Sequence, residues 1–145
     1  MRFRREAEYV ARLEHPHVIS VYQFGQQDPY IFYAMRLVEG RSLDHVLTEG
    51  LATSTGLRWL ADVADALGYA HEQHVIHRDI KPANIMISGD SAYLADFGLA
   101  RVLESTTITA SGVLLGTPLY MAPEQVRGER ATAASDRYSL GVVLD

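Results

Sequence analysis

Residues 75 to 87 read Val75-Ile76-His77-Arg78-Asp79-Ile80-Lys81-Pro82-Ala83-Asn84-Ile85-Met86-Ile87, and Asp96-Phe97-Gly98 follows further along the chain. Two short apolar runs with β character, residues 85–87 and 92–95, flank the turn-forming residues 88–91. This pattern is typical of a β-hairpin. In an antiparallel pair, the residue that enters the first strand lies beside the residue that leaves the second. We therefore expect Asn84 and Asp96 to be neighbours.

Asn84 and Asp96 would together offer an amide oxygen and a carboxylate. Such ligands suit a hard cation such as Mg²⁺, which keeps its other positions for water and phosphate oxygens. Pro82 stiffens the preceding loop, which presents Asp79 and Lys81 toward the same end of the hairpin. A carboxylate, an ammonium group and a two-ligand metal site are the parts that phosphoryl transfer requires, because positioning and charge neutralisation carry most of that catalysis.

With these residues in place, the sequence resembles the protein kinase family. The motifs occur in the family's order: His77-Arg78-Asp79 with Lys81 and Asn84, then Asp96-Phe97-Gly98, then Ala122-Pro123-Glu124. Gln125, and Tyr138 in place of the Trp common in eukaryotic kinases, resemble bacterial enzymes of the eukaryotic-like serine/threonine class.

The resemblance implies an α+β, protein-kinase-like two-lobe fold that is incomplete. It maps residues 1–145 to one partial protein kinase domain, with the end of the small lobe in 1–35, the hinge in 36–41 and the first half of the mainly helical large lobe in 42–145. We therefore expect a truncated or partial product of a bacterial serine/threonine kinase gene, inactive or nearly so by itself.

The resemblance also assigns roles to the central residues. Asp79 is the catalytic base that orients the substrate hydroxyl, Lys81 steadies the transferred phosphate of ATP, and Asn84 with Asp96 holds Mg²⁺. Lys81, two residues after Asp79, is the serine/threonine form of this loop, so tyrosine specificity is not expected. The implied reaction is ATP- and Mg²⁺-dependent phosphorylation of Ser or Thr hydroxyls on a protein.

Further ATP-binding residues follow from the same resemblance. Glu6 would pair with a strand lysine that contacts the ATP phosphates, but Lys81 is the only lysine of the chain, so that partner would lie upstream of Met1. The alternative for Glu6 is an i, i+4 pair with Arg2. Met35 would be the gatekeeper, which is also a packed core position, and Arg36-Leu37-Val38 the hinge whose backbone meets adenine.

The hydroxyl-rich stretch 99–116 resembles an activation loop. We expect Thr109 or Ser111 to be its main phosphorylation site, with Arg78 receiving the phosphate, although an unregulated polar surface loop is the alternative. Thr117 would bond Asp79 and Lys81 at the start of a substrate-positioning segment. Structural roles fall to residues expected to pack or anchor the site, namely His77, Phe97, Glu124 and Asp136.

Periodicity predicts the remaining elements. A helix is expected over residues 2–14, strands over 18–24 and 30–35, and a short helix from Ser42 as N-cap to Leu47. A longer helix should begin at residues 53–55. Its buried face is expected to carry Leu57, Leu60, Ala61, Ala64, Leu67 and His71.

Composition limits the class of protein. The chain of 145 residues is 48% hydrophobic with a net charge of −5, as expected of one globular domain with a core and with no basic footprint for nucleic acid. No apolar run could span a bilayer, and the absence of cysteine fits a reducing compartment. We expect a cytoplasmic location, either alone or as the cytoplasmic part of a membrane-anchored kinase.

Two other functions remain open on the sequence. A non-catalytic kinase relic used as a scaffold is one, although such a relic would have little reason to keep Asp79, Lys81, Asn84 and Asp96 together. A small-molecule phosphotransferase of kinase-like fold is the other, although the segment from Thr117 to Glu124 resembles a surface that serves protein substrates.

Overall fold

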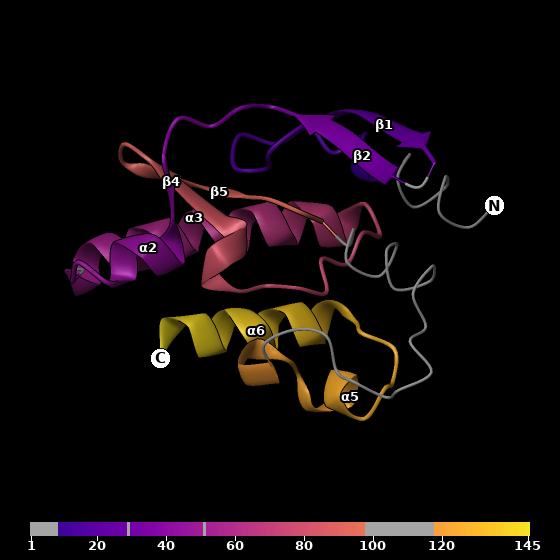
Figure 1. Ribbon diagram of the computed structural model, residues 1–145. Helices are drawn as coiled ribbons and strands as arrows, with labels where there is room; N and C mark the ends of the chain where they lie inside the picture. Colours follow the sequence, from indigo (N-terminus) through magenta and orange to yellow (C-terminus); the bar gives the residue numbers. More distant parts are fainter. Residues whose placement is uncertain (1–8, 29, 51, 98–117) are drawn as a thin grey trace.

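The computed structural model describes residues 9–28, 30–50, 52–97 and 118–145 (Figure 1). The elements, in chain order, are β1 (Val21–Gln27), β2 (Tyr30–Met35), β3 (Arg41–Ser42), α2 (Leu43–Leu47), α3 (Thr53–Glu72), the 3₁₀ turn η1 (Pro82–Asn84), β4 (Ile85–Ser88), β5 (Ser91–Leu94), the 3₁₀ turn η2 (Pro118–Tyr120), α5 (Pro123–Val126) and α6 (Ala133–Leu144). Figure 1 shows β1 and β2 above the β4–β5 hairpin, α2 and α3, with α5 and α6 below. No helix within the described ranges is long and apolar enough to cross a membrane.

The strands form two antiparallel sheets. One pairs β1 with β2, and the other has the order β3-β4-β5. The predicted hairpin is confirmed: Ile85 pairs with Leu94 and Ser88 with Ser91, so the tight turn lies at Gly89-Asp90. Along both strands buried residues alternate with half-buried ones, as expected for a sheet with one face against a core.

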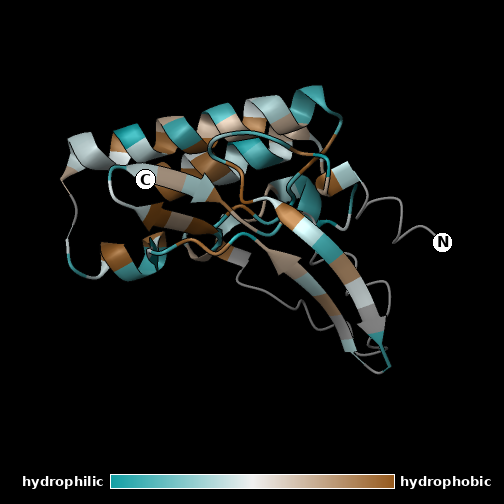
Figure 2. Cartoon of the chain, turned by 90° about the horizontal axis from the view of Figure 1, so that it is seen from above, coloured by the Kyte–Doolittle hydropathy of each residue, from teal (hydrophilic) through white to brown (hydrophobic). Residues whose placement is uncertain are grey.

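The long helix α3 packs on β5 and α6, and its buried face differs from the predicted one. The buried residues are Trp59, Val63, Ala66, Leu67 and Ala70. Of the predicted face, Leu67 is buried as expected, whereas Leu57 is 51% exposed and Ala61 and Ala64 face solvent. Both stripes repeat with a helical period, and Figure 2 shows hydrophobic and hydrophilic residues alternating along the helix. The inward face is therefore set by the packing of α3 on β5 and α6, which periodicity alone does not reveal.

Two predicted boundaries at the start of the chain are also wrong. In the described part of the predicted helix 2–14, only Tyr9 and Val10 are helical, and the chain then closes in a turn with Leu13 N donating to the carbonyl of Val10 (3.1 Å). The first strand begins at Val21 and not at residue 18. Val18 instead bridges Leu94 in a parallel sense, because the chain first pairs with the end of the hairpin.

The turn before α2 depends on a glycine. Ser42 precedes α2 as predicted, although its side chain makes no capping bond. Two residues earlier, a Cβ atom on Gly40 would lie 2.0 Å from the carbonyl oxygen of Ile87 in β4. The close approach of two backbone segments thus explains why the chain has glycine there.

We expect Gly40→Ala to lower the free energy of unfolding by about 1–3 kcal/mol, because the methyl group would overlap backbone that cannot move aside cheaply. Gly68→Ala, the matched control, lies on the solvent side of α3, where a methyl group meets no described neighbouring atom within 4 Å. It should raise that free energy by up to about 1 kcal/mol, since alanine favours the helix. Urea denaturation of both variants measures the sign of each change in the free energy of unfolding. Equal changes for the two variants would contradict the packing described here.

Candidate active site

The side chains of Asp79, Lys81 and Asn84 contact one another in the loop before the hairpin. Lys81 donates from Nζ to Oδ2 of Asp79 (2.8 Å), and Asn84 donates from Nδ2 both to that oxygen (3.0 Å) and to the Asp79 carbonyl (2.7 Å). Pro82 opens η1 at a position where a helix tolerates proline. The turn ends at Asn84, directly before the first residue of β4. Asp79 and Lys81 keep 32% and 28% of their side chains exposed, so the ion pair is open to a ligand.

A buried carboxylate from α6 holds the backbone of this loop. Asp136 is 1% exposed and accepts from the backbone N of His77 (2.8 Å) and of Arg78 (2.7 Å), and from Nε2 of His71 (2.8 Å). Arg78 has a φ of +73°, a region that costs energy for a residue with a side chain. The two backbone hydrogen bonds to Asp136 hold this conformation in place.

His77 is fully buried and bonded on both ring nitrogens. Its Nε2 donates to the carbonyl of Ala95 (2.7 Å), and its Nδ1 accepts from the backbone N of Asp79 (3.3 Å). The ring packs against Phe97 with centroids 4.7 Å apart, in the same core as Val10 and Val21. Burial lowers the pKa of His77, outweighing the opposite effects of Asp136 and of the Ala95 carbonyl.

This environment predicts a pH dependence. An unfolded histidine takes up a proton near pH 6.5, whereas folded His77 stays neutral to lower pH because its burial disfavours the charged ring. The contribution of His77 to stability is therefore complete above about pH 6.5 and falls as the pH drops from there toward the lowered folded pKa. Ring ¹⁵N chemical shifts should show a neutral Nε2–H tautomer of His77 throughout this fall. A His77 ring that takes up its proton near pH 6.5 in the folded protein would contradict the prediction.

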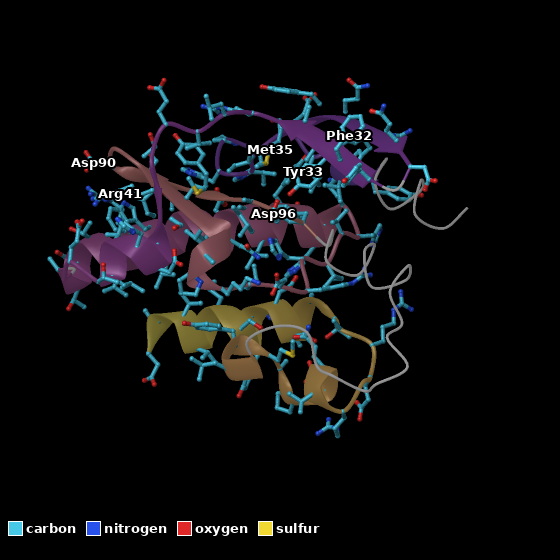
Figure 3. The ribbon with its side chains drawn as sticks, viewed as in Figure 1. Phe32, Tyr33, Met35, Arg41, Asp90 and Asp96 are labelled. Carbon is cyan, nitrogen blue, oxygen red and sulfur yellow. The ribbon has the colours of Figure 1, made fainter. Side chains whose placement is uncertain are left out.

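Asp96 follows the second strand of the hairpin, at the same end as Asn84, whose carbonyl accepts from the backbone N of Ala95 (2.9 Å). It adopts a φ of +59° and accepts a hydrogen bond at Oδ1 from the hydroxyl of Tyr33 (2.5 Å). Figure 3 shows Tyr33 on β2 above Asp96. Burial, and then the bond to Asp96, raise the pKa of Tyr33, so its hydroxyl remains a donor.

The residues present fit a hard divalent cation. Because both amide hydrogens of Asn84 go to Asp79, its carbonyl oxygen Oδ1 is the atom left to offer a metal, and Asp96 offers Oδ2. Within the described ranges no cluster of three or more His, Cys, Asp or Glu forms a closed metal cage. Two oxygen ligands with open positions match an ion that completes its shell with water and phosphate.

The residues predicted to meet adenine lie on and after β2. Met35 is 42% exposed rather than packed in the core, and Leu37 is 84% exposed. Arg36 donates its backbone N to the carbonyl of Ser20 (2.9 Å), and its guanidinium lies 5.5 Å from the ring centroid of Tyr93 in β5. Sequence reasoning did not anticipate this cation–π contact between the two sheets.

On the opposite side, Glu124 in α5 accepts a hydrogen bond from the hydroxyl of Ser135 in α6 (2.5 Å). That bond is the main cause of a lowered pKa of Glu124. Sequence reasoning also missed the contacts of Tyr33 with Asp96 and of Gln125 with the Arg78 carbonyl. Both join residues far apart in the chain, and no local pattern marked either one.

Several predicted site residues lie outside the described residues. They are Glu6, Gly98, Thr109, Ser111 and Thr117. Their assigned roles therefore stay predictions.

Comparison with known proteins identifies the family. The family model described as protein kinase domain matches residues 1–145. The chain is 41% identical to serine/threonine-protein kinase PrkC of Bacillus subtilis and 44% identical to serine/threonine-protein kinase PknB of Mycolicibacterium smegmatis, covering 99% of this chain and 22% and 24% of those proteins. The crystal structure of the Mycobacterium tuberculosis PknI kinase domain superposes with a TM-score of 0.79 at 32% identity, covering 99% of this chain and 54% of that one.

The chain therefore belongs to the protein kinase family, and it resembles bacterial serine/threonine kinases within it. The predicted kinase-like α+β fold and its partial extent are confirmed. The chain spans about a quarter of the length of the curated relatives and about half of the solved kinase domain.

Proposed function

We propose that this protein transfers the γ-phosphoryl group of ATP to Ser or Thr hydroxyls of a protein substrate. The observation that carries the proposal is the cluster of Asp79, Lys81 and Asn84, with Asp96 at the same end of the hairpin, in a chain of the protein kinase family. Such transfer asks for an acceptor of the substrate hydroxyl proton, a cation near the γ-phosphate and a metal site.

Each residue has one part in the mechanism. Asp79, open to solvent, accepts the hydrogen bond of the substrate hydroxyl and orients its oxygen toward the phosphorus. Lys81, held 2.8 Å from Asp79, is placed to contact the transferred phosphate beside the attacking oxygen. Asn84 and Asp96 would hold Mg²⁺, which when bound neutralises phosphate charge.

The surrounding assignments extend the proposal. Met35 and the backbone of Arg36-Leu37-Val38 would contact adenine. Glu6 would pair with a lysine that contacts the ATP phosphates. Thr109 or Ser111 would carry a regulatory phosphate. We propose a cytoplasmic site of action, alone or as the cytoplasmic part of a membrane-anchored kinase, because the reaction consumes ATP. The acidic net charge of −5 favours a protein substrate over nucleic acid as a partner.

The test uses the protein expressed from its complete open reading frame, incubated with γ-labelled ATP, Mg²⁺ and a Ser/Thr-rich acceptor protein. Label should appear in phosphoserine or phosphothreonine, and EDTA should stop its appearance. Nucleotide-independent binding of a partner without transfer would favour the scaffold. Label confined to a small molecule would indicate a phosphotransferase of another class.

A further inference from the structure

The peptide group between Arg78 and Asp79 is held at both ends. Its N–H, on Asp79, donates to Nδ1 of His77 (3.3 Å), and its carbonyl, on Arg78, accepts from Nε2 of Gln125 (2.9 Å). The first partner belongs to the loop itself. Gln125 comes from α5, which lies 47 positions further along the chain.

Gln125 makes this contact with an amide that is itself fixed. Its Oε1 accepts from the backbone N of Ala122 (3.2 Å), closing the first turn of α5, and this bond points its Nε2 toward the loop. The side chain is half-buried. An amide has an acceptor on one side and a donor on the other, so Gln125 serves both partners at once.

The carbonyl of Arg78 needs such a partner. At a φ of +73°, Arg78 holds a backbone conformation that a residue with a side chain rarely adopts, and Asp136 fixes only the N–H on its near side (2.7 Å). Rotation of the following peptide would swing the carboxylate of Asp79 away from Lys81. Gln125 is the described side chain that opposes this rotation from the carbonyl side.

We propose that Gln125 is a positioning residue for Asp79, and this proposal rests on the proposed function. Gln125 would couple α5 to the loop that carries Asp79, Lys81 and Asn84. The alternative is that Gln125 only caps α5 through Ala122. Two substitutions separate these roles. Gln125→Glu keeps an oxygen for the Ala122 N–H but faces the Arg78 carbonyl with a second acceptor, whereas Gln125→Met keeps the bulk and loses both bonds.

In the protein from the complete open reading frame, Gln125→Glu and Gln125→Met should each lower kcat by about tenfold, the effect of one well-placed hydrogen bond, with KM for ATP unchanged. The amide hydrogen of Asp79 should exchange with solvent about tenfold faster in both. Gln73→Glu, an exposed change of the same kind after α3, is the control and should alter neither quantity. All variants should keep the urea midpoint of the parent to within the effect of a single cap.

Loss of kcat and faster exchange in Gln125→Met alone, with Gln125→Glu like the parent, would assign Gln125 to capping and overturn the proposal. Unchanged exchange at Asp79 in both variants would also overturn it. If the parent transfers no phosphate, the proposed function fails. The exchange measurement then still decides whether Gln125 holds the peptide before Asp79.

Discussion

Replacing Asp79 with Asn is expected to lower the rate of phosphoryl transfer by about 10²–10⁴-fold, the usual contribution of a positioned acid or base. The amide has nearly the same shape but cannot take a proton, and it loses the charge that holds Lys81 at 2.8 Å. Asn84 can still donate to the backbone carbonyl of residue 79, so the loop should keep its course. The measurement is kcat with γ-labelled ATP, alongside the urea midpoint.

The control for this change is Asp90→Asn in the hairpin turn. Asp90 is 89% exposed and paired only with the half-exposed Arg58 among the described contacts, so its loss should alter neither kcat nor folding measurably. An Asp79→Asn variant that folds and retains a third or more of the parent rate would remove Asp79 from the mechanism.

Replacing Asp136 with Ala should be the most destabilising single change, at about 3–5 kcal/mol. The carboxylate is 1% exposed, and its loss would leave the N–H groups of His77 and Arg78 and the ring of His71 without their acceptor. Each buried donor left unsatisfied costs about 1–3 kcal/mol. Because a domain of this kind is stable by only about 5–15 kcal/mol, the change removes much of the margin.

Urea denaturation monitored by circular dichroism gives the free energy of unfolding for this variant. Asp136→Asn should lie between the parent and the alanine variant, since its one oxygen can serve some of the donors while its amide group opposes the others. Asp90→Ala, on the surface, should cost no more than about 1 kcal/mol. Equal losses for the buried and the exposed aspartate would show that the loop does not depend on Asp136.

The sequence pattern predicted correctly those features that depend on residues close together in the chain. Two short apolar runs around the turn-forming residues 88–91 predicted the hairpin, and antiparallel pairing then placed Asn84 and Asp96 at one end of it. The spacing of Asp79, Lys81 and Asn84 within one short loop likewise predicted that they converge. In both cases the residues are separated by so short a stretch of backbone that the local conformation determines which side chains become neighbours.

Prediction failed for contacts between segments that are far apart in the chain. On α3 the stripes through Leu57 and through Trp59 have the same period, and only the hairpin and α6 select the second. Tyr33 reaches Asp96 across 63 positions and Gln125 reaches Arg78 across 47, so neither contact leaves a periodic signal in its own neighbourhood. Hydrogen bonds of this kind depend on tertiary packing, which a single sequence does not encode locally.

We expect Asn84 and Asp96 to present oxygens to one metal ion beside Asp79. A crystal structure of the protein from its complete open reading frame with Mn²⁺ and a non-hydrolysable ATP analogue tests this arrangement most directly. The anomalous signal of the metal should lie about 2.1 Å from Asn84 Oδ1 and from an Asp96 carboxylate oxygen, as for a small hard cation. The γ-phosphate should then lie between the metal and Lys81. A metal and triphosphate bound elsewhere, with Asp96 still turned to Tyr33 alone, would contradict the account.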